Sequence, residues 1–156
     1  ARVMPGDPGH ETIHASCVAI HGHAVLICGA SGAGKSDLTL RLLDRGAALI
    51  SDDYTLLQCM GDQLIASAPA NIAGKIEVRG IGIVDWPCIP EAPVVLGLTL
   101  NSSPDRMPPE ILPNRSILGT DVPFLALDGL HASAPIKVEL AVRGIVDALH
   151  KMREGS

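Results

Sequence analysis

The chain has 156 residues, of which 47% are hydrophobic and 19% are charged, a composition typical of one globular domain rather than of a disordered segment. A net charge of -5 with no Lys/Arg cluster argues against nucleic acid or an anionic membrane as a partner, and no apolar stretch approaches the roughly 20 residues that span a bilayer. Because the first ten residues also lack a signal-peptide pattern, we expect a cytoplasmic protein. Cys17, Cys28, Cys59 and Cys88 form no C-x-x-C pair, so they predict free thiols rather than a zinc or redox site.

In chain order, the sequence predicts a leader and then a single domain. Residues 1–11 contain prolines and glycines without periodicity and predict a flexible leader, which leaves residues 12–156 for the folded part. The apolar segments 13–20 and 24–28 flank the turn residues His21-Gly22-His23 and predict a strand hairpin.

The next segments combine helix and strand patterns, as in the α/β class. Residues 36–45 place leucines on one face and predict a helix that ends at Gly46. Further strands are predicted over residues 47–50, 54–58, 64–66, 94–100 and 124–127.

Two long segments carry no regular pattern, and a helix follows them. Glycines interrupt residues 70–86, which predict an exposed functional loop, and Pro87, Pro90 and Pro93 are expected to end any regular element beyond it. Residues 101–113 predict a polar loop. Apolar residues at helical spacing from Pro135 onward predict a C-terminal amphipathic helix with Ser133 as its N-cap. We therefore expect a mixed sheet with flanking helices.

A glycine-rich loop follows the second apolar segment and precedes the helix. Its residues are Gly29, Ala30, Ser31, Gly32, Ala33, Gly34, Lys35 and Ser36, which match the pattern G-x-x-x-x-G-K-S. Backbone N–H groups of such a loop converge on phosphate oxygens, Lys35 can reach the transferred phosphoryl group, and the Ser36 hydroxyl can ligate Mg²⁺. The loop therefore predicts an ATP site, and the alternative is a tight glycine turn that happens to contain a lysine.

Two adjacent acids, Asp52 and Asp53, end the strand that follows the loop's helix. A βαβ unit would bring both to the carboxyl edge of the sheet, beside the phosphates. One of them can hold Mg²⁺ while the other accepts the proton of an attacking hydroxyl, which is the chemistry of phosphoryl transfer. The alternative is a turn capped by exposed aspartates.

Three further sets of residues are candidates for this site. Glu77 can complete the metal shell and Arg79 can stabilise phosphoryl charge, although a solvated Glu-x-Arg pair fits these residues equally well. His14 lies on the strand before the loop, where a structural role is the alternative to a role near the phosphoryl group. His21-x-His23 lacks a third metal ligand, and we interpret it as a turn.

The loop, the Asp pair, His14 and above all Glu77-Val78-Arg79-Gly80-Ile81-Gly82-Ile83 resemble the catalytic domain of HPr kinase/phosphorylase, a bacterial protein-serine kinase. The resemblance implies a fold akin to the nucleotide domain of phosphoenolpyruvate carboxykinase, ATP-dependent phosphorylation of a seryl hydroxyl on the phosphocarrier protein HPr, and a homohexamer. It also implies Asp52 as catalytic base, Lys35 as phosphate clamp, His14 near the phosphoryl group, and Ser36, Asp53 and Glu77 as the Mg²⁺ shell.

The chain departs from the family pattern in two places. Members usually carry a separate N-terminal domain, whereas a short leader precedes the first predicted strand here, as in an excised catalytic domain or a short form. The family's R-P-G-R stretch serves the reverse, phosphate-dependent reaction, and residues 128–131 lack an arginine. The kinase direction is therefore favoured over the phosphorylase direction. Two other functions stay open: a small-molecule kinase with a lid containing Arg106 and Arg115, and a nucleotide-gated regulatory protein.

Overall fold

The computed structural model describes residues 9–30, 32–101, 103–104 and 109–155, so most of the predicted leader, Ser31 and Arg106 lie outside the described residues. The strands are β1 (His10–Ile13), β2 (Ser16–Ile20), β3 (His23–Cys28), β4 (Ala48–Ser51), β5 (Thr55–Met60), β6 (Gln63–Ser67), β7 (Lys75–Val78), β8 (Gly82–Asp85), β9 (Glu91–Leu100), β10 (Asn114–Ile117) and β11 (Thr120–Leu127). The helices are α1 (Lys35–Asp44) and α2 (Ala134–Glu154).

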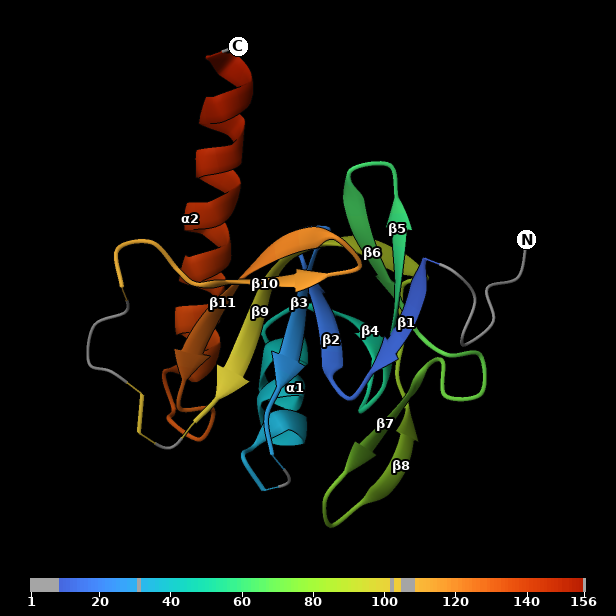
Figure 1. The fold of residues 1–156 in the computed structure, drawn as a ribbon. Coiled ribbons are helices and arrows are strands. Elements are labelled where there is room, and N and C mark those ends of the chain that lie inside the picture. Colours follow the sequence, from blue (N-terminus) through green and yellow to red (C-terminus); the bar gives the residue numbers. More distant parts are fainter. Residues whose placement is uncertain (1–8, 31, 102, 105–108, 156) are drawn as a thin grey trace.

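A strongly curled mixed sheet forms the body of the domain (Figure 1). Its strands follow the order β1-β5-β6-β9-β3-β2-β4, and β9 is the strand at which the sheet forks. One edge of β9 pairs in parallel with β3, while the other edge pairs first with β6 and then in parallel with β11. The close approach at the fork needs a glycine, because a Cβ on Gly97 would lie 2.4 Å from the Phe124 ring.

Both helices pack against the same face of this sheet. Leucines of α1 and the buried side chains of α2 share one apolar cluster with residues of β2, β3, β4 and β9. A second cluster lies on the opposite face and is closed by strands, since β5, β6, β10 and β11 supply its residues together with the central strands. The expected flanking helices thus lie on one face, and on the opposite face the sheet covers itself by curling.

The crossover from β3 through α1 to β4 positions the candidate site. β2 pairs antiparallel with both β3 and β4, so β3 and β4 run in the same direction with β2 between them. The predicted βαβ unit is therefore present, but its two strands are not neighbours. Their carboxyl ends still meet one edge of the sheet, about 10 Å apart at the usual strand spacing.

Several local predictions are confirmed. β2 and β3 form the predicted hairpin around His21 and Gly22. The strands predicted over residues 54–58 and 64–66 are present as β5 and β6, which pair with each other around Gly61 and Asp62. α1 is followed by Gly46 in a left-handed conformation, with φ of 106°. Ser133 occupies the N-cap position of α2, although its side chain makes no capping hydrogen bond.

Other local predictions are wrong. Residues 75–85 form the β7–β8 hairpin rather than a loop, and Pro93 lies inside β9 instead of ending it. β10 was not predicted, because its sequence is polar and three of its four residues are exposed. β1 begins at His10, so the last two residues of the expected leader already pair with β5.

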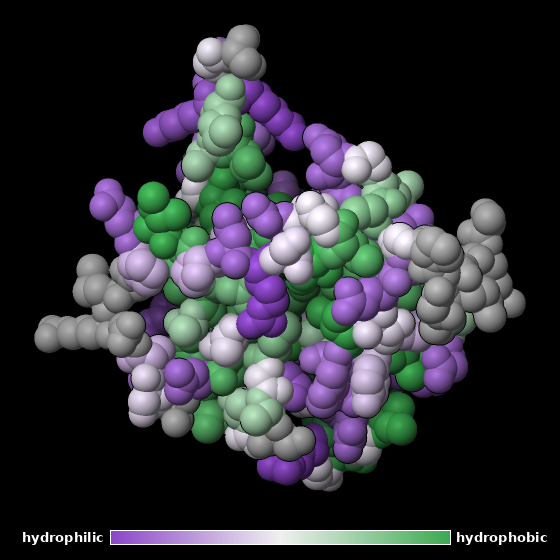
Figure 2. Space-filling view, in the orientation of Figure 1, coloured by the Kyte–Doolittle hydropathy of each residue, from purple (hydrophilic) through white to green (hydrophobic). Residues whose placement is uncertain are grey.

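The end of α2 projects from the body, as the space-filling view shows (Figure 2). Every described residue from Asp147 onward is exposed, including Leu149 at 42% and Met152 at 72%. Among the described residues, neither α1 nor α2 combines the length and the apolar character that a bilayer-spanning helix needs.

Candidate active site

The glycine-rich loop joins the end of β3 to the start of α1. Gly32 and Gly34 adopt φ of 83° and 94°, a left-handed conformation that glycine tolerates best. A Cβ on Gly34 would also lie 2.8 Å from Leu130. α1 starts at Lys35, so the unpaired N–H groups of its first turn and its positive end face the loop. The loop therefore has the strand-loop-helix setting that was expected for it.

Lys35 is a buried cation without a counter-charge in the described residues. Its side chain is only 8% exposed, and its Nζ donates a hydrogen bond of 2.6 Å to the carbonyl oxygen of Gly29. An ammonium has three donors, and buried charges are normally paired. Lys35 therefore has donors left for an anion in the loop.

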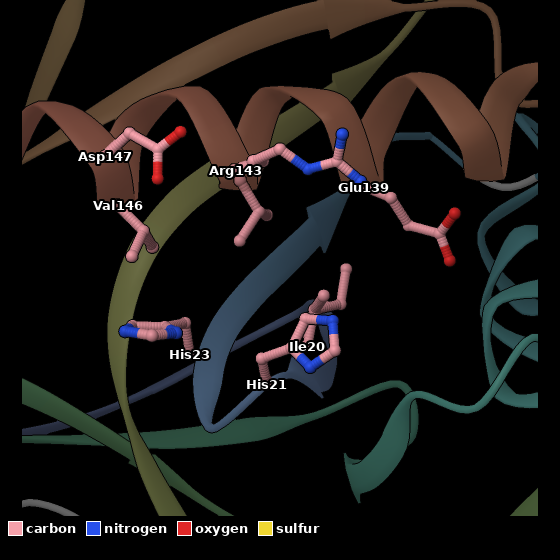
Figure 3. Close-up of a pocket in the computed structure, with 8 residues that line it drawn as sticks. Ile20, His21, His23, Glu139, Arg143, Val146 and Asp147 are labelled. Carbon is pink, nitrogen blue, oxygen red and sulfur yellow. The ribbon is translucent and has the colours of Figure 1, made fainter.

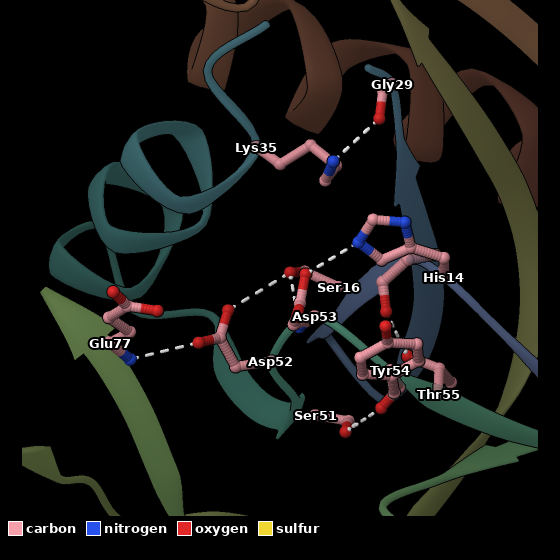
Figure 4. A network of polar contacts seen from close by, with 11 residues as sticks. His14, Ser16, Gly29, Lys35, Ser51, Asp52, Asp53, Tyr54, Thr55 and Glu77 are labelled. Atoms are coloured by element: carbon pink, nitrogen blue, oxygen red, sulfur yellow. Dashed lines mark hydrogen bonds and ion pairs between the residues drawn. The ribbon is translucent and has the colours of Figure 1, made fainter. Parts of the chain in front are cut away.

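Asp52 is held inside the protein by two hydrogen bonds (Figure 4). It is 8% exposed, its Oδ1 accepts a bond of 3.1 Å from Ser16 Oγ, and its Oδ2 accepts a bond of 2.9 Å from the backbone N–H of Glu77. Both carboxylate oxygens thus connect elements far apart in sequence, namely β2 and the β7–β8 hairpin.

Asp53, by contrast, faces solvent. Its side chain is 55% exposed, and one oxygen lies 2.8 Å from Nε2 of His14, while the other makes no hydrogen bond within the described residues. Its backbone is left-handed with φ of 68°, an uncommon conformation for a residue other than glycine, and its N–H donates to Ser16 Oγ at 2.9 Å. The His14 ring in turn stacks on Tyr54 with 5.0 Å between centroids. These contacts hold one carboxylate oxygen in place and leave the other available.

The sheet places these groups next to the loop. Ser16 pairs with Ile27, two residues before Gly29, and the next residue of β2 pairs with Ser51 at the end of β4. Figure 4 shows Lys35 and the His14–Asp53 pair at this same edge. The structure therefore brings together the loop, His14 and both aspartates, as predicted. Sequence reasoning missed Ser16, whose only signal is a hydroxyl at the start of an apolar strand.

Glu77 and Arg79 lie on the β7–β8 hairpin. Ile76 anchors this hairpin in the core beneath α1, and Lys75 pairs with Asp85 at 2.8 Å. The backbone of Glu77 reaches Asp52, and its side chain is exposed. Arg79 lies in the exposed turn of the hairpin and makes no hydrogen bond or ion pair within the described residues. The structure thus brings Glu77 to the acid pair and leaves Arg79 at its margin.

The oxygen donors at this edge fit Mg²⁺. Ser36 offers an exposed hydroxyl in the first turn of α1, Asp53 offers its free oxygen, and Glu77 offers an exposed carboxylate. Among the described residues no three imidazole, thiol or carboxylate groups cluster. Mg²⁺ does not require such a cluster, since it usually takes one or two carboxylates and completes its octahedron with phosphates and water.

The segment 128–131 borders the loop, and an arginine from elsewhere holds it. Arg41 of α1 donates to the carbonyl oxygens of Gly129 and His131, the latter at 2.8 Å. Its Nε bonds Asp37 at 2.9 Å. Arg41 therefore uses its donors to fix the chain rather than to bind phosphate.

A cavity of about 280 Å³ lies at the opposite end of β3, between the β2–β3 turn and α2. Figure 3 shows His21 and His23 on one wall and Arg143 and Asp147 on the other. Nδ1 of His23 is buried without a hydrogen-bond partner in the described part of the chain. The two histidines lie in the predicted turn, remote from the loop.

All four cysteines are free, as predicted. Burial raises the pKa of the Cys17 thiol. Burial also raises the pKa of Cys28, the residue before the loop, although the charges of Arg115 and Lys35 act in the opposite direction. The charges of one residue of the loop and one residue of β10 therefore both act on the Cys28 thiol.

Comparison with known proteins gives consistent results. The family profile described as HPr serine kinase C-terminal domain matches residues 9–89, which include every candidate residue from His14 to Arg79. The HPr kinase/phosphorylase of Pelodictyon phaeoclathratiforme is 33% identical over 132 residues, 76% of this chain and 40% of that protein. That of Caldanaerobacter subterraneus subsp. tengcongensis is 47% identical over 75 residues, 47% of this chain and 25% of that protein.

A solved structure, described as the HPr(Ser) kinase/phosphatase from Coxiella burnetii, shares the fold. It matches with a TM-score of 0.80 and 30% identity, and the match covers 93% of this chain and 96% of that one. Several curated HPr kinase/phosphorylases, in contrast, are matched over about a quarter of their own length.

Proposed function

The chain belongs to the family of the HPr serine kinase C-terminal domain, and on that premise we propose that it is an ATP-dependent protein-serine kinase that phosphorylates a seryl hydroxyl of the phosphocarrier protein HPr. The observation that carries the proposal is the buried, unpaired ammonium of Lys35 at the same sheet edge as an exposed carboxylate. An anion in the loop would balance Lys35, and a hydroxyl between loop and carboxylate would lie where phosphoryl transfer needs it.

The contacts favour Asp53 over Asp52 as the catalytic base. Both oxygens of Asp52 already accept hydrogen bonds in a buried position, whereas one oxygen of Asp53 is free and exposed. In the proposed step, Asp53 takes the proton of the seryl hydroxyl while the seryl oxygen forms a bond to the terminal phosphorus of ATP. The bond between that phosphorus and the bridging oxygen breaks, and ADP is released. His14 orients Asp53, and Asp52 fixes the β7–β8 hairpin.

Charge on the phosphoryl group is balanced by Lys35 and by the N–H groups of the loop residues Gly29 to Ser36. Ser36 and Glu77 would hold Mg²⁺, and the ion would neutralise the phosphates. The free oxygen of Asp53, which could also have served as a metal ligand, is then left to accept the seryl proton. Arg79, at the tip of the hairpin, is available to the acceptor or to the phosphoryl group.

Exposed apolar side chains beside the site support a protein acceptor rather than a metabolite. Ile81 and Ile83 on the hairpin are 77% and 74% exposed, and Tyr54, stacked on His14, is 48% exposed. Apolar groups open to solvent around a reactive carboxylate are typical of a protein-docking surface. A small-molecule kinase would be expected to enclose its substrate.

The test is mass spectrometry of HPr after incubation with this chain and MgATP. We expect one added phosphate on a serine, loss of transfer in Asp53→Asn, and residual transfer in Asp52→Asn, with ATP binding retained in both. Full transfer activity of Asp53→Asn would show that Asp53 is not the catalytic base. Label on a metabolite panel alone would favour the small-molecule kinase, and ATP binding without transfer would favour the regulatory protein. Adding inorganic phosphate to phosphorylated HPr then tests the reverse, phosphorylase reaction.

Three further expectations accompany this function. We infer that the chain forms a homo-oligomer, a hexamer by the family resemblance, and the exposed Leu149 and Met152 on the projecting end of α2 support a contact with another subunit. Light scattering would measure its mass. A cytoplasmic location and a likeness to the nucleotide domain of phosphoenolpyruvate carboxykinase are expected on the same grounds.

A further inference from the structure

A second cavity, also of about 280 Å³, opens beside the proposed site on the face of the sheet away from the helices. Its apolar floor comes from Ile13, Ile117 and Phe124. Its polar side chains are Glu11 and His14 near β1, Cys28 at the end of β3, and Arg115 and Ser116 of β10. An apolar floor with a few convergent polar groups is typical of a small-ligand site.

Arg115 is the cation of this cavity, and its position is fixed. Its guanidinium lies 4.0 Å from the centroid of the Phe124 ring, so one face of the group is held by an aromatic stack. No carboxylate forms an ion pair with it in the described residues, not even Glu11 of the same lining. The edge and the outer face of the guanidinium thus remain available, and guanidinium groups bind phosphate and carboxylate through paired N–H donors.

The positive charge extends from the cavity to the phosphate loop. Burial raises the pKa of Cys28, which lines the cavity and directly precedes the loop, and the charges of Arg115 and Lys35 both oppose this rise. His14 belongs to the cavity lining and also bonds Asp53 at 2.8 Å. A ligand that contacts the His14 ring would therefore act on the carboxylate pair without occupying the loop.

We propose that the cavity between β1, β10 and β11 binds a small phosphate-bearing anion through Arg115, as a second anion site distinct from the loop that holds the nucleotide phosphates. His14 links this site to Asp53. The binding itself does not rest on the proposed kinase reaction, since it needs only the cavity and the unpaired guanidinium. The two sites are separable because their cations, Arg115 and Lys35, lie on different elements.

The experiment uses inorganic phosphate as the probe. The chain is first saturated with a non-hydrolysable ATP analogue and Mg²⁺, and phosphate is then titrated while backbone amide signals are followed by NMR. We expect saturable shifts at Ser116 and Ile117, with the signals of Gly32 and Gly34 already fixed by the analogue. If phosphate moves only Gly32 and Gly34, it enters the loop alone and the cavity site is overturned.

Substitutions provide the second readout. Arg115→Gln is expected to weaken phosphate binding at Ser116 about tenfold or more, because a hydrogen bond to a charged group is lost. Arg115→Lys keeps the charge and should bind with intermediate affinity, whereas Arg143→Gln, an exposed arginine on α2, should match the wild type. An unchanged affinity in folded Arg115→Gln overturns the proposal. If the ATP analogue leaves Gly32 and Gly34 unmoved, the nucleotide site is contradicted, and the response at Ser116 still decides the cavity.

Discussion

Replacing Asp52 with alanine tests whether this carboxylate holds the site together. The substitution removes the acceptor of two hydrogen bonds, one from Ser16 Oγ at 3.1 Å and one from the Glu77 amide at 2.9 Å. Hydrogen bonds to a charged group contribute about 1.5–3 kcal/mol each, and the loss is partly relieved because Ser16 Oγ keeps its bond from the Asp53 amide. We therefore expect a loss of about 3 kcal/mol in the free energy of unfolding.

Thermal and denaturant unfolding measure this loss. A loss of about 3 kcal/mol corresponds to a fall of roughly 6–12 °C in melting temperature for a domain of this size. Asp52→Asn keeps the shape of the side chain and one acceptor oxygen, and its amide can donate to Ser16 Oγ. For this variant we therefore expect a loss of about 1 kcal/mol in the free energy of unfolding. Asp53→Asn is the matched control, because Asp53 is exposed and asparagine tolerates a left-handed backbone well.

Hydrogen exchange separates this explanation from a general loss of packing. Within β7, the Glu77 amide points to Asp52, so its protection depends on that carboxylate. In Asp52→Ala the Glu77 amide should exchange much faster than in the wild type. The exchange rates of amides in the central strand β3 should change only as far as the global stability changes. Equal exchange of Glu77 in variant and wild type, with a stability change below about 1 kcal/mol, would refute the structural role.

Lys35→Met is expected to abolish the stabilisation by MgATP that thermal unfolding measures. Without nucleotide, its melting temperature should be no lower than that of the wild type, because the substitution removes a buried, unpaired charge. A clearly lower melting temperature of the nucleotide-free variant would contradict this. Gly97→Ala should lower the free energy of unfolding by about 1–3 kcal/mol, because the new Cβ would lie 2.4 Å from the Phe124 ring. Adding Phe124→Leu in the same chain should recover part of this loss. Additive effects of the two substitutions on stability would argue against the contact. Lys75 lowers the pKa of Asp85, so their ion pair stabilises the hairpin at pH values above the usual pKa of an aspartate. This stabilisation is lost as the pH falls through the lowered pKa of Asp85. An NMR titration should show a higher Asp85 pKa in Lys75→Met, and an unchanged pKa would contradict the ion pair.

Two features of the candidate site follow from local sequence patterns. The glycine-rich loop, its strand and its helix were predicted correctly, because each is encoded by neighbouring residues: an apolar run, glycines that permit positive φ, and leucines at helical spacing. The meeting of Asp52 and Asp53 with the loop was also predicted, since it depends only on the direction of β4 relative to β3.

The different surroundings of the two aspartates could not be predicted. Asp52 and Asp53 are adjacent and identical in type, and what separates them is a contact with Ser16, 36 residues earlier than Asp52, and a contact with His14, 39 residues earlier than Asp53. Which carboxylate becomes buried depends on the twist of the chain after β4, where Asp53 turns into a left-handed conformation.

Local patterns in the sequence predict the glycine-rich loop, the strand and the helix that flank it, and the residue types of the candidate site, because short-range periodicity and backbone preferences encode these features. The fold was needed to show that β2 separates β3 from β4, that the Glu77 segment is a hairpin bonded to Asp52, and that Arg115 and Cys28 line one cavity. These features could not be predicted because strand order, burial and charge proximity arise from contacts between distant residues, which no local pattern encodes.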